Sequence, residues 1–188
     1  MDLHFFLILS YLKLIHNDIM ELRISSDEII HTDLANGLSF ILRHVPKIDN
    51  LRIYASTTGK ILPAISVGNC HIKNCYIIIH MINDESNTNQ MFNQRLMMLV
   101  DEWKELFNDG KIENLKIKNM SSNPLHYSII VDDSYFLYGN YIPKEESTTK
   151  VVVKEPYIFT NACMELERII NKYTEWFDEI FNEIDSEL

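Results

Sequence analysis

A histidine, a serine and an aspartate lie close together in one stretch of the sequence, and they are side-chain types that could carry acid–base or nucleophilic chemistry. His126 opens an apolar run, Ser128 follows two residues later, and Asp133 comes in the polar turn after that run. Gly139-Asn140 then closes the next apolar run. Imidazole and carboxylate groups are common proton carriers in active sites. His126 and Asp133 could therefore take part in such chemistry, and Ser128, Gly139 and Asn140 lie close to them in the sequence.

Each of these residues also has a structural interpretation. A histidine at the start of a strand can be a hydrogen-bonded structural residue, and aspartate is favoured in turns because its side chain bonds the local backbone. Ser128 could be a small inward-facing strand residue. Gly139-Asn140 could be a bend or a bulge in a strand. The sequence leaves both interpretations open.

A separate candidate site, for an anion, is the turn Ser56-Thr57-Thr58-Gly59. Its hydroxyls and backbone N–H groups would face an anion at the start of the following helix. Ser56 and Thr57 are therefore candidate ligand-binding residues. The turn is not a nucleotide-binding P-loop, because only one glycine precedes Lys60 and the required spacing is absent.

The elements that must position these residues alternate between strands and helices. Strands are predicted at 51–55, 75–82, 115–117, 126–131, 135–138 and 151–153. A short helix is predicted to end near Gly68, a long helix to cover 87–107, and a last helix to run from about Asn161 to the C-terminus. A break is predicted at Asp49-Asn50, and a polar loop over 141–150. This alternation predicts an α/β fold in which helices flank a mixed β-sheet. We expect the apolar triplets 77–79 and 129–131 to be buried in adjacent strands of that sheet.

The N-terminal part of the chain has a helical pattern of its own. Apolar residues recur at steps of three and four, which is typical of an a/d seam that another surface covers: Phe5, Ile8, Leu12, Ile15, Ile19 and Leu22. A capping box at 25–28 precedes a second helical stretch, whose apolar face holds Leu34, Leu38, Ile41 and Leu42. We therefore divide the chain into a helical segment, 1–48, which packs on the domain or on a dimer mate, and an α/β domain, 49–188. No internal repeat is evident.

Composition limits the partners. The chain has 188 residues, 46% of them hydrophobic, with Gly 5 and Pro 5, which is typical of one globular domain. Its 17 basic and 27 acidic residues give a net charge of -10, which does not favour nucleic acid or anionic membranes as partners. The N-terminus lacks the features of a signal peptide, and its apolar run is too short to span a bilayer.

Three cysteines, Cys70, Cys75 and Cys163, form neither a C-x-x-C motif nor a disulfide framework. This is typical of the cytoplasm, where we expect the protein. We interpret Cys70 and Cys75 as small buried residues rather than zinc ligands, because no second ligand pair has finger spacing. We expect no metal and no cofactor.

The stretch from 123 to 140 resembles the phospholipase D superfamily motif H-x-K-x4-D followed by G-[SG]-x-N. His126, Ser128, Asp133 and Gly139 take the histidine, lysine, aspartate and glycine positions. The resemblance implies that His126, Asp133 and Ser128, at the degenerate lysine position, are the catalytic residues, and that Gly139 and Asn140 contact the ligand. From about Asp49 onward, the layout is similar to half-sized, single-motif phospholipase D-like domains, including some of bacterial regulators and defence proteins. The resemblance implies a site shared by two copies, in which one imidazole attacks phosphorus and the other protonates the leaving oxygen. It therefore implies a homodimer.

The departures from the motif weaken this chemistry. Ser128 replaces the lysine whose ammonium holds the phosphate oxygens, and Asn140 and Ile142 replace a small residue and an asparagine. Another cation would be needed, for which Lys73, Lys116 and Lys118 are candidates.

Two functions follow from the resemblance. The first is a degenerate phospholipase D-like module, dimeric and with little or no phosphodiesterase activity. It would act as a sensing, scaffold or interaction domain with a protein partner, for example in a bacterial regulatory or defence system. The alternative is an active homodimeric phosphodiesterase or nuclease, in which His126 of each chain forms or resolves a phosphohistidine. The sequence favours the first.

Overall fold

The computed structural model describes residues 29–31, 37–39, 41–42, 45–81, 87–120, 126–144, 147–153, 157–160 and 164–188. Its elements are β1 (Ile29–His31), β2 (Lys47–Tyr54), α3 (Leu62–Val67), β3 (His71–Ile79), α4 (Asn87–Asn108), β4 (Ile112–Asn119), β5 (His126–Val131), β6 (Tyr135–Lys144), β7 (Ser147–Val153), β8 (Tyr157–Thr160) and α5 (Met164–Glu183). The predicted a/d seam over 5–22 and the capping box at 25–28 lie outside the described residues.

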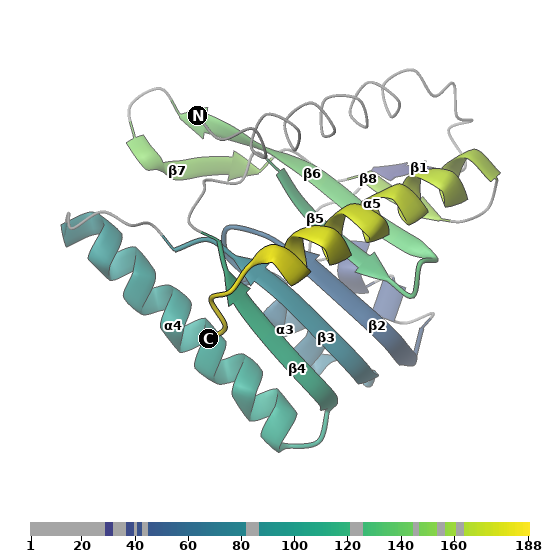
Figure 1. Ribbon diagram of the computed structural model, residues 1–188, viewed down its shortest axis with the longest axis horizontal. Helices are drawn as coiled ribbons and strands as arrows, with labels where there is room; N and C mark the ends of the chain where they lie inside the picture. The colour runs from purple at the N-terminus through teal and green to yellow at the C-terminus, as the bar shows by residue number, and fades with distance from the viewer. Residues whose placement is uncertain are drawn as a thin grey trace.

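The strands form one mixed sheet (Figure 1). Its order is β1-β8-β6-β5-β2-β3-β4, and β7 pairs with β6. The strands β2, β3 and β4 are parallel, whereas β5 is antiparallel to both β2 and β6. Helix α5 covers one face, and α3 and α4 pack on the other. The predicted α/β fold class, a mixed sheet flanked by helices, is confirmed.

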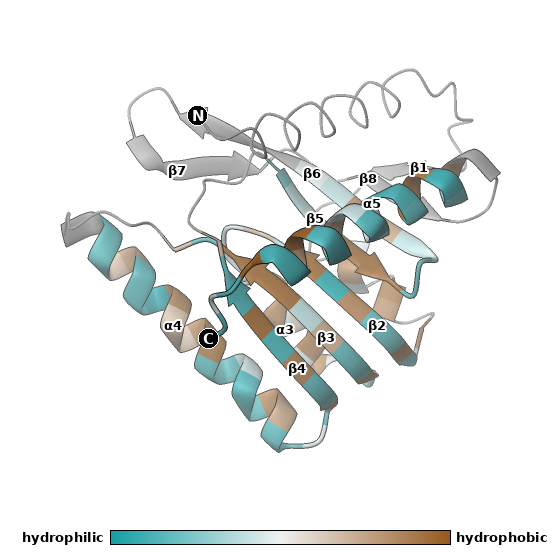
Figure 2. Ribbon diagram, in the orientation of Figure 1, coloured by the Kyte–Doolittle hydropathy of each residue, from teal (hydrophilic) through white to brown (hydrophobic). Residues whose placement is uncertain are grey.

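The core lies on both faces of the sheet, as the hydropathy colouring indicates (Figure 2). The apolar triplets 77–79 of β3 and 129–131 of β5 are buried, as predicted. They are not in adjacent strands, because β2 lies between β3 and β5. Residues 38, 41 and 42 are buried in the same core, so this part of the N-terminal segment packs on the domain.

Several element boundaries differ from those predicted. Asp49-Asn50 does not break the chain but lies inside β2, because β3 supplies its backbone partners. The predicted polar loop over 141–150 contains the end of β6 and the start of β7, which pair with each other. Residues 29–31 form a strand rather than a helix, because β8 offers them a sheet edge. Backbone pairing overrides side-chain polarity in each case.

Helix α4 buries a narrower stripe than its apolar residues predict. Leu96, Val100 and Trp103 are buried, whereas Met91 is 71% exposed and Phe107 is 44% exposed. The sheet is accessible to one side of this helix only, so apolar residues away from that side remain on the surface. Among the described residues, no helix is both long and apolar enough to cross a membrane.

The three parallel strands carry a repeat that contradicts the expectation of none. Each contains Ile-x-Asn followed by an apolar residue: Ile48-Asp49-Asn50-Leu51, Ile72-Lys73-Asn74-Cys75 and Ile112-Glu113-Asn114-Leu115. The three asparagines lie in register, Asn50 beside Asn74 and Asn74 beside Asn114. Only three or four positions recur in each copy, so the pattern becomes evident only when the strands are aligned in space.

Candidate functional site

His126 is the first residue of β5, and its side chain is buried between aromatic rings under α5. The imidazole is 3% exposed. It stacks on Tyr54 of β2, with 4.9 Å between ring centroids, and lies 5.2 Å from the ring of Tyr138 in β6. Trp176 of α5 covers it at 5.4 Å. These contacts make His126 part of the packing between the sheet and α5.

A second buried histidine lies beside the same tyrosine. His80 follows the last residue of β3 and is 2% exposed, and its ring meets the Tyr54 ring edge-on at 5.1 Å. His80 is not among the residues that the sequence predicts for the site. A signal was present, because His80 interrupts the apolar run 75–82. The carboxyl ends of the parallel strands β2 and β3 lie at the same end of the sheet as the start of antiparallel β5. This arrangement brings both imidazoles to Tyr54.

Ser128 lies on the same face of β5 as His126, because residues two apart in a strand share a face. It is 1% exposed and lies between Tyr54 and Tyr138 in the register of the sheet. Its Oγ makes no hydrogen bond to any described residue, and neither does Nε1 of Trp176. The structure thus brings Ser128 and His126 together, in an enclosure that is mostly aromatic.

Two of the tyrosines near His126, Tyr138 and Tyr173, are not suited to act as general bases at neutral pH. Burial raises the pKa of the Tyr138 phenol. Burial also raises the pKa of Tyr173, whose ring lies 6.2 Å from that of His126. Both phenols therefore stay protonated, and neither can act as a general base.

Asp133 is not near His126. It follows the opposite end of β5, about 17 Å away at about 3.3 Å per strand residue. Asp132 and Asp133 have φ angles of 50° and 52°, and N of Ser134 donates to O of Val131 at 3.0 Å, as in a type I′ hairpin turn. Aspartate tolerates this left-handed conformation, so the residue suits its position in the turn.

The Asp133 carboxylate belongs to a polar cluster that joins the hairpin, β2 and α5. Arg52 donates through Nη1 to Asp133 at 3.3 Å, and through Nε and Nη2 to Asp178 of α5 at 2.8 and 3.0 Å. The Thr174 hydroxyl donates to the same Asp133 oxygen at 3.1 Å. These contacts attach α5 to the sheet and assign Asp133 no contact with His126.

Gly139 lies on the opposite face of the sheet from the His126 side chain. It pairs in register with Tyr127, whose ring covers the position that a Cβ on Gly139 would occupy. The glycine is therefore needed for close packing. Asn140 pairs in register with His126, and its side chain is outside the described ones.

The turn after β2 uses its hydroxyls internally. Thr57 Oγ1 accepts a hydrogen bond from N of Gly59 at 3.3 Å, and Thr58 Oγ1 accepts one from Nε1 of Trp103 at 2.9 Å. Ser56 is partly buried and Thr57 is exposed. The turn starts two residues after Tyr54, so the fold brings it to the His126 end of the sheet, where its predicted role in anion binding stays a prediction.

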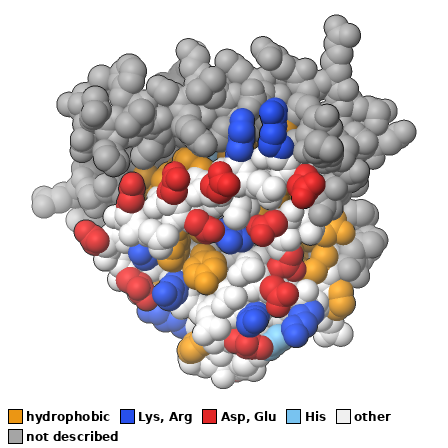
Figure 3. Space-filling model, turned by 45° about the vertical axis from the view of Figure 1, so that its right-hand side comes forward, with side chains coloured by type: hydrophobic (Ala, Val, Ile, Leu, Met, Phe, Trp, Pro, Cys, Tyr) orange, Lys and Arg blue, Asp and Glu red, His pale blue; other side chains and the backbone are white. Residues whose placement is uncertain are grey.

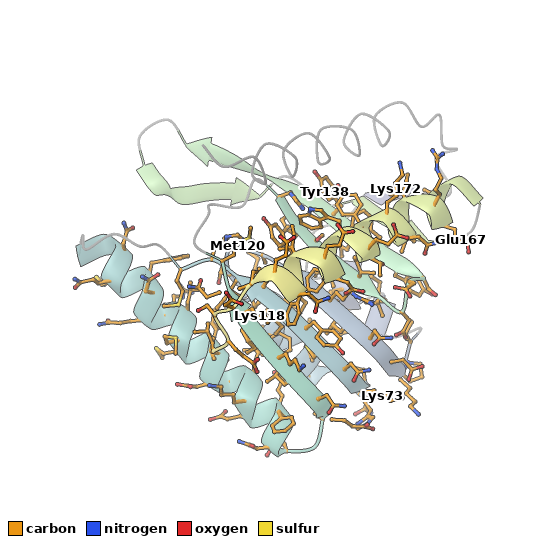
Figure 4. All side chains as sticks on the ribbon, viewed as in Figure 1. Lys73, Lys118, Met120, Tyr138, Glu167 and Lys172 are labelled. Atoms are coloured by element: carbon orange, nitrogen blue, oxygen red, sulfur yellow. The ribbon has the colours of Figure 1, made fainter. Side chains whose placement is uncertain are left out.

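The three lysines considered as replacement cations are placed elsewhere. Lys118 donates to the carbonyl oxygens of Phe181 and Ile184, both at 2.7 Å, and so caps the end of α5. Lys73 lies at the end of β3 remote from Tyr138 (Figure 4). Lys116 is exposed in the middle of β4. None of the three lies at His126.

The two described cysteines are buried, as predicted. Burial raises the pKa of both thiols, which keeps them protonated. His71, which follows Cys70, pairs with Glu113 and not with a cysteine, with 2.8 Å between Nε2 and Oε1. Within the described part of the chain, no three histidine, cysteine or acidic side chains are grouped closely enough to hold a metal ion.

Comparisons with known proteins give one kind of similarity. No protein-family model matches the chain, and no curated protein does. Among solved structures, the chain is similar to Nuc from Salmonella typhimurium, a phospholipase D family member. The identity is 12%, the TM-score is 0.49, and the match covers 84% of this chain and 96% of that one. This similarity concerns the path of the chain alone and carries no information about the chemistry at His126.

Proposed function

We propose that this protein is a phospholipase D-like module that does not hydrolyse phosphodiesters and acts through binding to a protein partner. The observation that carries the proposal is the burial of His126, which is 3% exposed between the rings of Tyr54 and Tyr138. A nucleophile needs an open approach to phosphorus, and packed rings occupy the faces of this imidazole. A sensing or scaffold role in a bacterial regulatory or defence system is the setting we propose.

Charge around the site supports the same proposal. Phosphoryl transfer needs cations where negative charge develops, and the lysine position holds the neutral, buried Ser128. The outer side of α5 carries Glu167, Arg168, Lys172, Glu175 and Glu179. Figure 3 shows acidic and basic side chains interspersed over this face. A basic stripe, the usual signature of a nucleic-acid groove, is not visible on it.

The first test combines hydrolysis with stability. We expect no turnover of bis(p-nitrophenyl) phosphate by the wild type. We expect His126→Ala to lower the free energy of unfolding by roughly 2 kcal/mol or more, because a buried ring leaves a cavity. His71→Ala is the matched control and should stay within about 0.5 kcal/mol, because His71 is on the surface. Turnover that disappears in His126→Ala without loss of stability would establish the active enzyme instead.

Ser128→Lys extends this test. The variant restores the motif lysine, but the structure places that ammonium in an aromatic enclosure, where an unpaired charge is costly. We expect a lower melting temperature and no hydrolysis. A gain of hydrolysis in Ser128→Lys would show that the remainder of an active site is in place, and would contradict the proposal.

We also propose that the protein is a homodimer. The support comes from the sequence, namely the single motif and the apolar seam over 5–22. Sedimentation equilibrium at micromolar concentration should give twice the chain mass. A single monomeric species over that range would contradict the proposal.

A further inference from the structure

The repeated asparagines form a hydrogen-bonded ladder across the three parallel strands. Asn74 donates through Nδ2 to Oδ1 of Asn50 at 3.1 Å and to the carbonyl oxygen of Asp49 at 3.1 Å. Asn114 repeats this arrangement, donating to Oδ1 of Asn74 and to the carbonyl oxygen of Lys73, both at 3.2 Å. Asn74 and Asn114 therefore each donate to the neighbouring strand through the same two contacts.

The ladder has a direction, and it stops at a sheet edge. Asn50 and Asn74 each accept a hydrogen bond on Oδ1 from the next strand. Asn114 is exposed on β4, the last strand of the sheet, and its Oδ1 accepts no hydrogen bond from the described residues. The carbonyl oxygen of Glu113 is the second acceptor by analogy with Lys73. This edge thus presents the acceptor pair that the two earlier strands use to bind an asparagine.

An apolar groove lies on the other face of the same edge. It has a volume of about 300 Å³ and lies between α4 and β4, lined by Lys104, Phe107, Asn108, Leu115, Ile117 and Leu188. In the repeat, the residue after asparagine points to this face, where Leu51 and Cys75 are buried. A further strand with the same motif would therefore place its apolar residue beside Leu115 and Phe107.

The C-terminal end of the β4 edge already pairs with an extended segment. The C-terminal tail pairs with the end of β4, where N of Leu188 donates to O of Ile117 at 2.9 Å and N of Asn119 donates to O of Ser186 at 3.0 Å. These bonds show that the C=O group of Ile117 and the N–H group of Asn119 point away from β3. Because backbone direction alternates along a strand, Leu115 points its N–H and C=O to the same side as Ile117. Among the described residues, none pairs with the outward side of 112–116.

We propose that the β4 edge, residues 112–116, binds an extended segment of a protein partner, aligned parallel to β4 and carrying an asparagine followed by a large aliphatic residue. The incoming amide donates to Asn114 Oδ1 and to the carbonyl of Glu113, and the aliphatic side chain enters the groove against Phe107. Main-chain pairing supplies affinity and the two side chains supply selectivity. This inference rests on the proposed function, because it names the partner chemistry of the same module.

A second copy of the chain does not meet these requirements. A twofold axis through this edge would pair two identical β4 strands antiparallel. The asparagine contacts of the ladder belong to parallel strands in register. A twofold dimer through β4 therefore does not fit the ladder, and the occupant we propose is a segment of another protein.

The test uses a labelled peptide with the sequence of 111–116, Lys-Ile-Glu-Asn-Leu-Lys, and fluorescence anisotropy with the full chain. We expect saturable binding below millimolar concentration, and at least about fivefold weaker binding when the peptide asparagine is alanine. With Asn114→Ala protein, the two peptides should bind equally, because the coupled pair is lost. Asn171→Ala on α5 is the matched control and should leave binding unchanged. No saturable binding, or equal affinity of both peptides for the wild type, would overturn the proposal.

Leu115→Pro tests the edge itself. Proline removes an N–H that points away from β3, and it also replaces the partly buried Leu115 side chain that lines the groove. We expect the fold to persist, as measured by circular dichroism, and the peptide affinity to fall at least tenfold, and further than in Leu115→Ala, which shortens the side chain but keeps the N–H. If Leu115→Pro instead dissociates a dimer, a second copy occupies this edge and the proposal is wrong. Peptide binding is independent of hydrolysis. Turnover together with intact peptide binding would contradict the non-hydrolytic function but support the edge site. No turnover together with no peptide binding would contradict the edge site alone.

Discussion

The Gly139→Ala variant is expected to lose about 3 kcal/mol of its free energy of unfolding, at the upper end of the usual cost of overpacking. A Cβ on Gly139 would lie 2.6 Å from Cε1 of Tyr127 and closer still to Cζ and OH of that ring. Tyr127 is 1% exposed, so its ring has no free space to move into. Chemical denaturation monitored by tryptophan fluorescence measures the loss.

Two comparisons make this prediction specific. Gly59→Ala should stay within about 0.5 kcal/mol of the wild type, because its Cβ would meet neighbours only at ordinary contact distances of 3.6 and 3.7 Å. Gly139→Ala should cost less in a Tyr127→Ala background, because the two residues are in contact and their effects couple. Equal stability of Gly139→Ala and the wild type would contradict the packing role. It would favour the contact with a ligand that the motif implies.

Ile130→Ala should lower the free energy of unfolding by roughly 2–5 kcal/mol. Ile130 is 1% exposed in β5, lies between Arg52 and Phe136 in the register of the sheet, and packs in the cluster beneath α5. Truncation leaves a cavity that a sheet paired on both sides cannot close. Thermal and urea unfolding of the variant measure the loss.

Val67→Ala is the matched control for this truncation. Val67 is 88% exposed at the end of α3, so its loss should change stability by less than about 0.5 kcal/mol. A loss below about 1 kcal/mol for Ile130→Ala would mean that α5 adjusts to fill the space. That outcome would contradict a rigid enclosure around His126, on which the non-hydrolytic proposal depends.

The motif residues show why the candidate site could be predicted only in part. His126 and Ser128 are two residues apart, and in a strand that spacing places both on one face, so their proximity follows from local geometry. Asp133 is seven residues from His126 and lies beyond the far end of β5. An extended strand separates its two ends by a distance that sequence spacing does not convey.

The residues that enclose His126 come from distant parts of the chain. Tyr54 and Trp176 lie on β2 and α5, and no local pattern relates them to β5. Their meeting depends on the strand order and on the angle at which α5 crosses the sheet. The aromatic enclosure, which decides between a reactive and a structural histidine, is therefore a property of the tertiary structure.

Local patterns by themselves determined the α/β class, the long helix α4, the hairpin between β5 and β6 and the buried triplets 77–79 and 129–131, because side-chain periodicity reports which face of an element is buried. The tertiary structure alone decided that Asp49-Asn50 continues β2, that 141–150 contains paired strands, and that the three asparagines form a ladder ending at β4. Strand pairing joins residues far apart in sequence, and the backbone groups that form it are the same in every residue. The amino-acid pattern therefore carries little information about which strands meet, and the functional surfaces of this protein are built where they do.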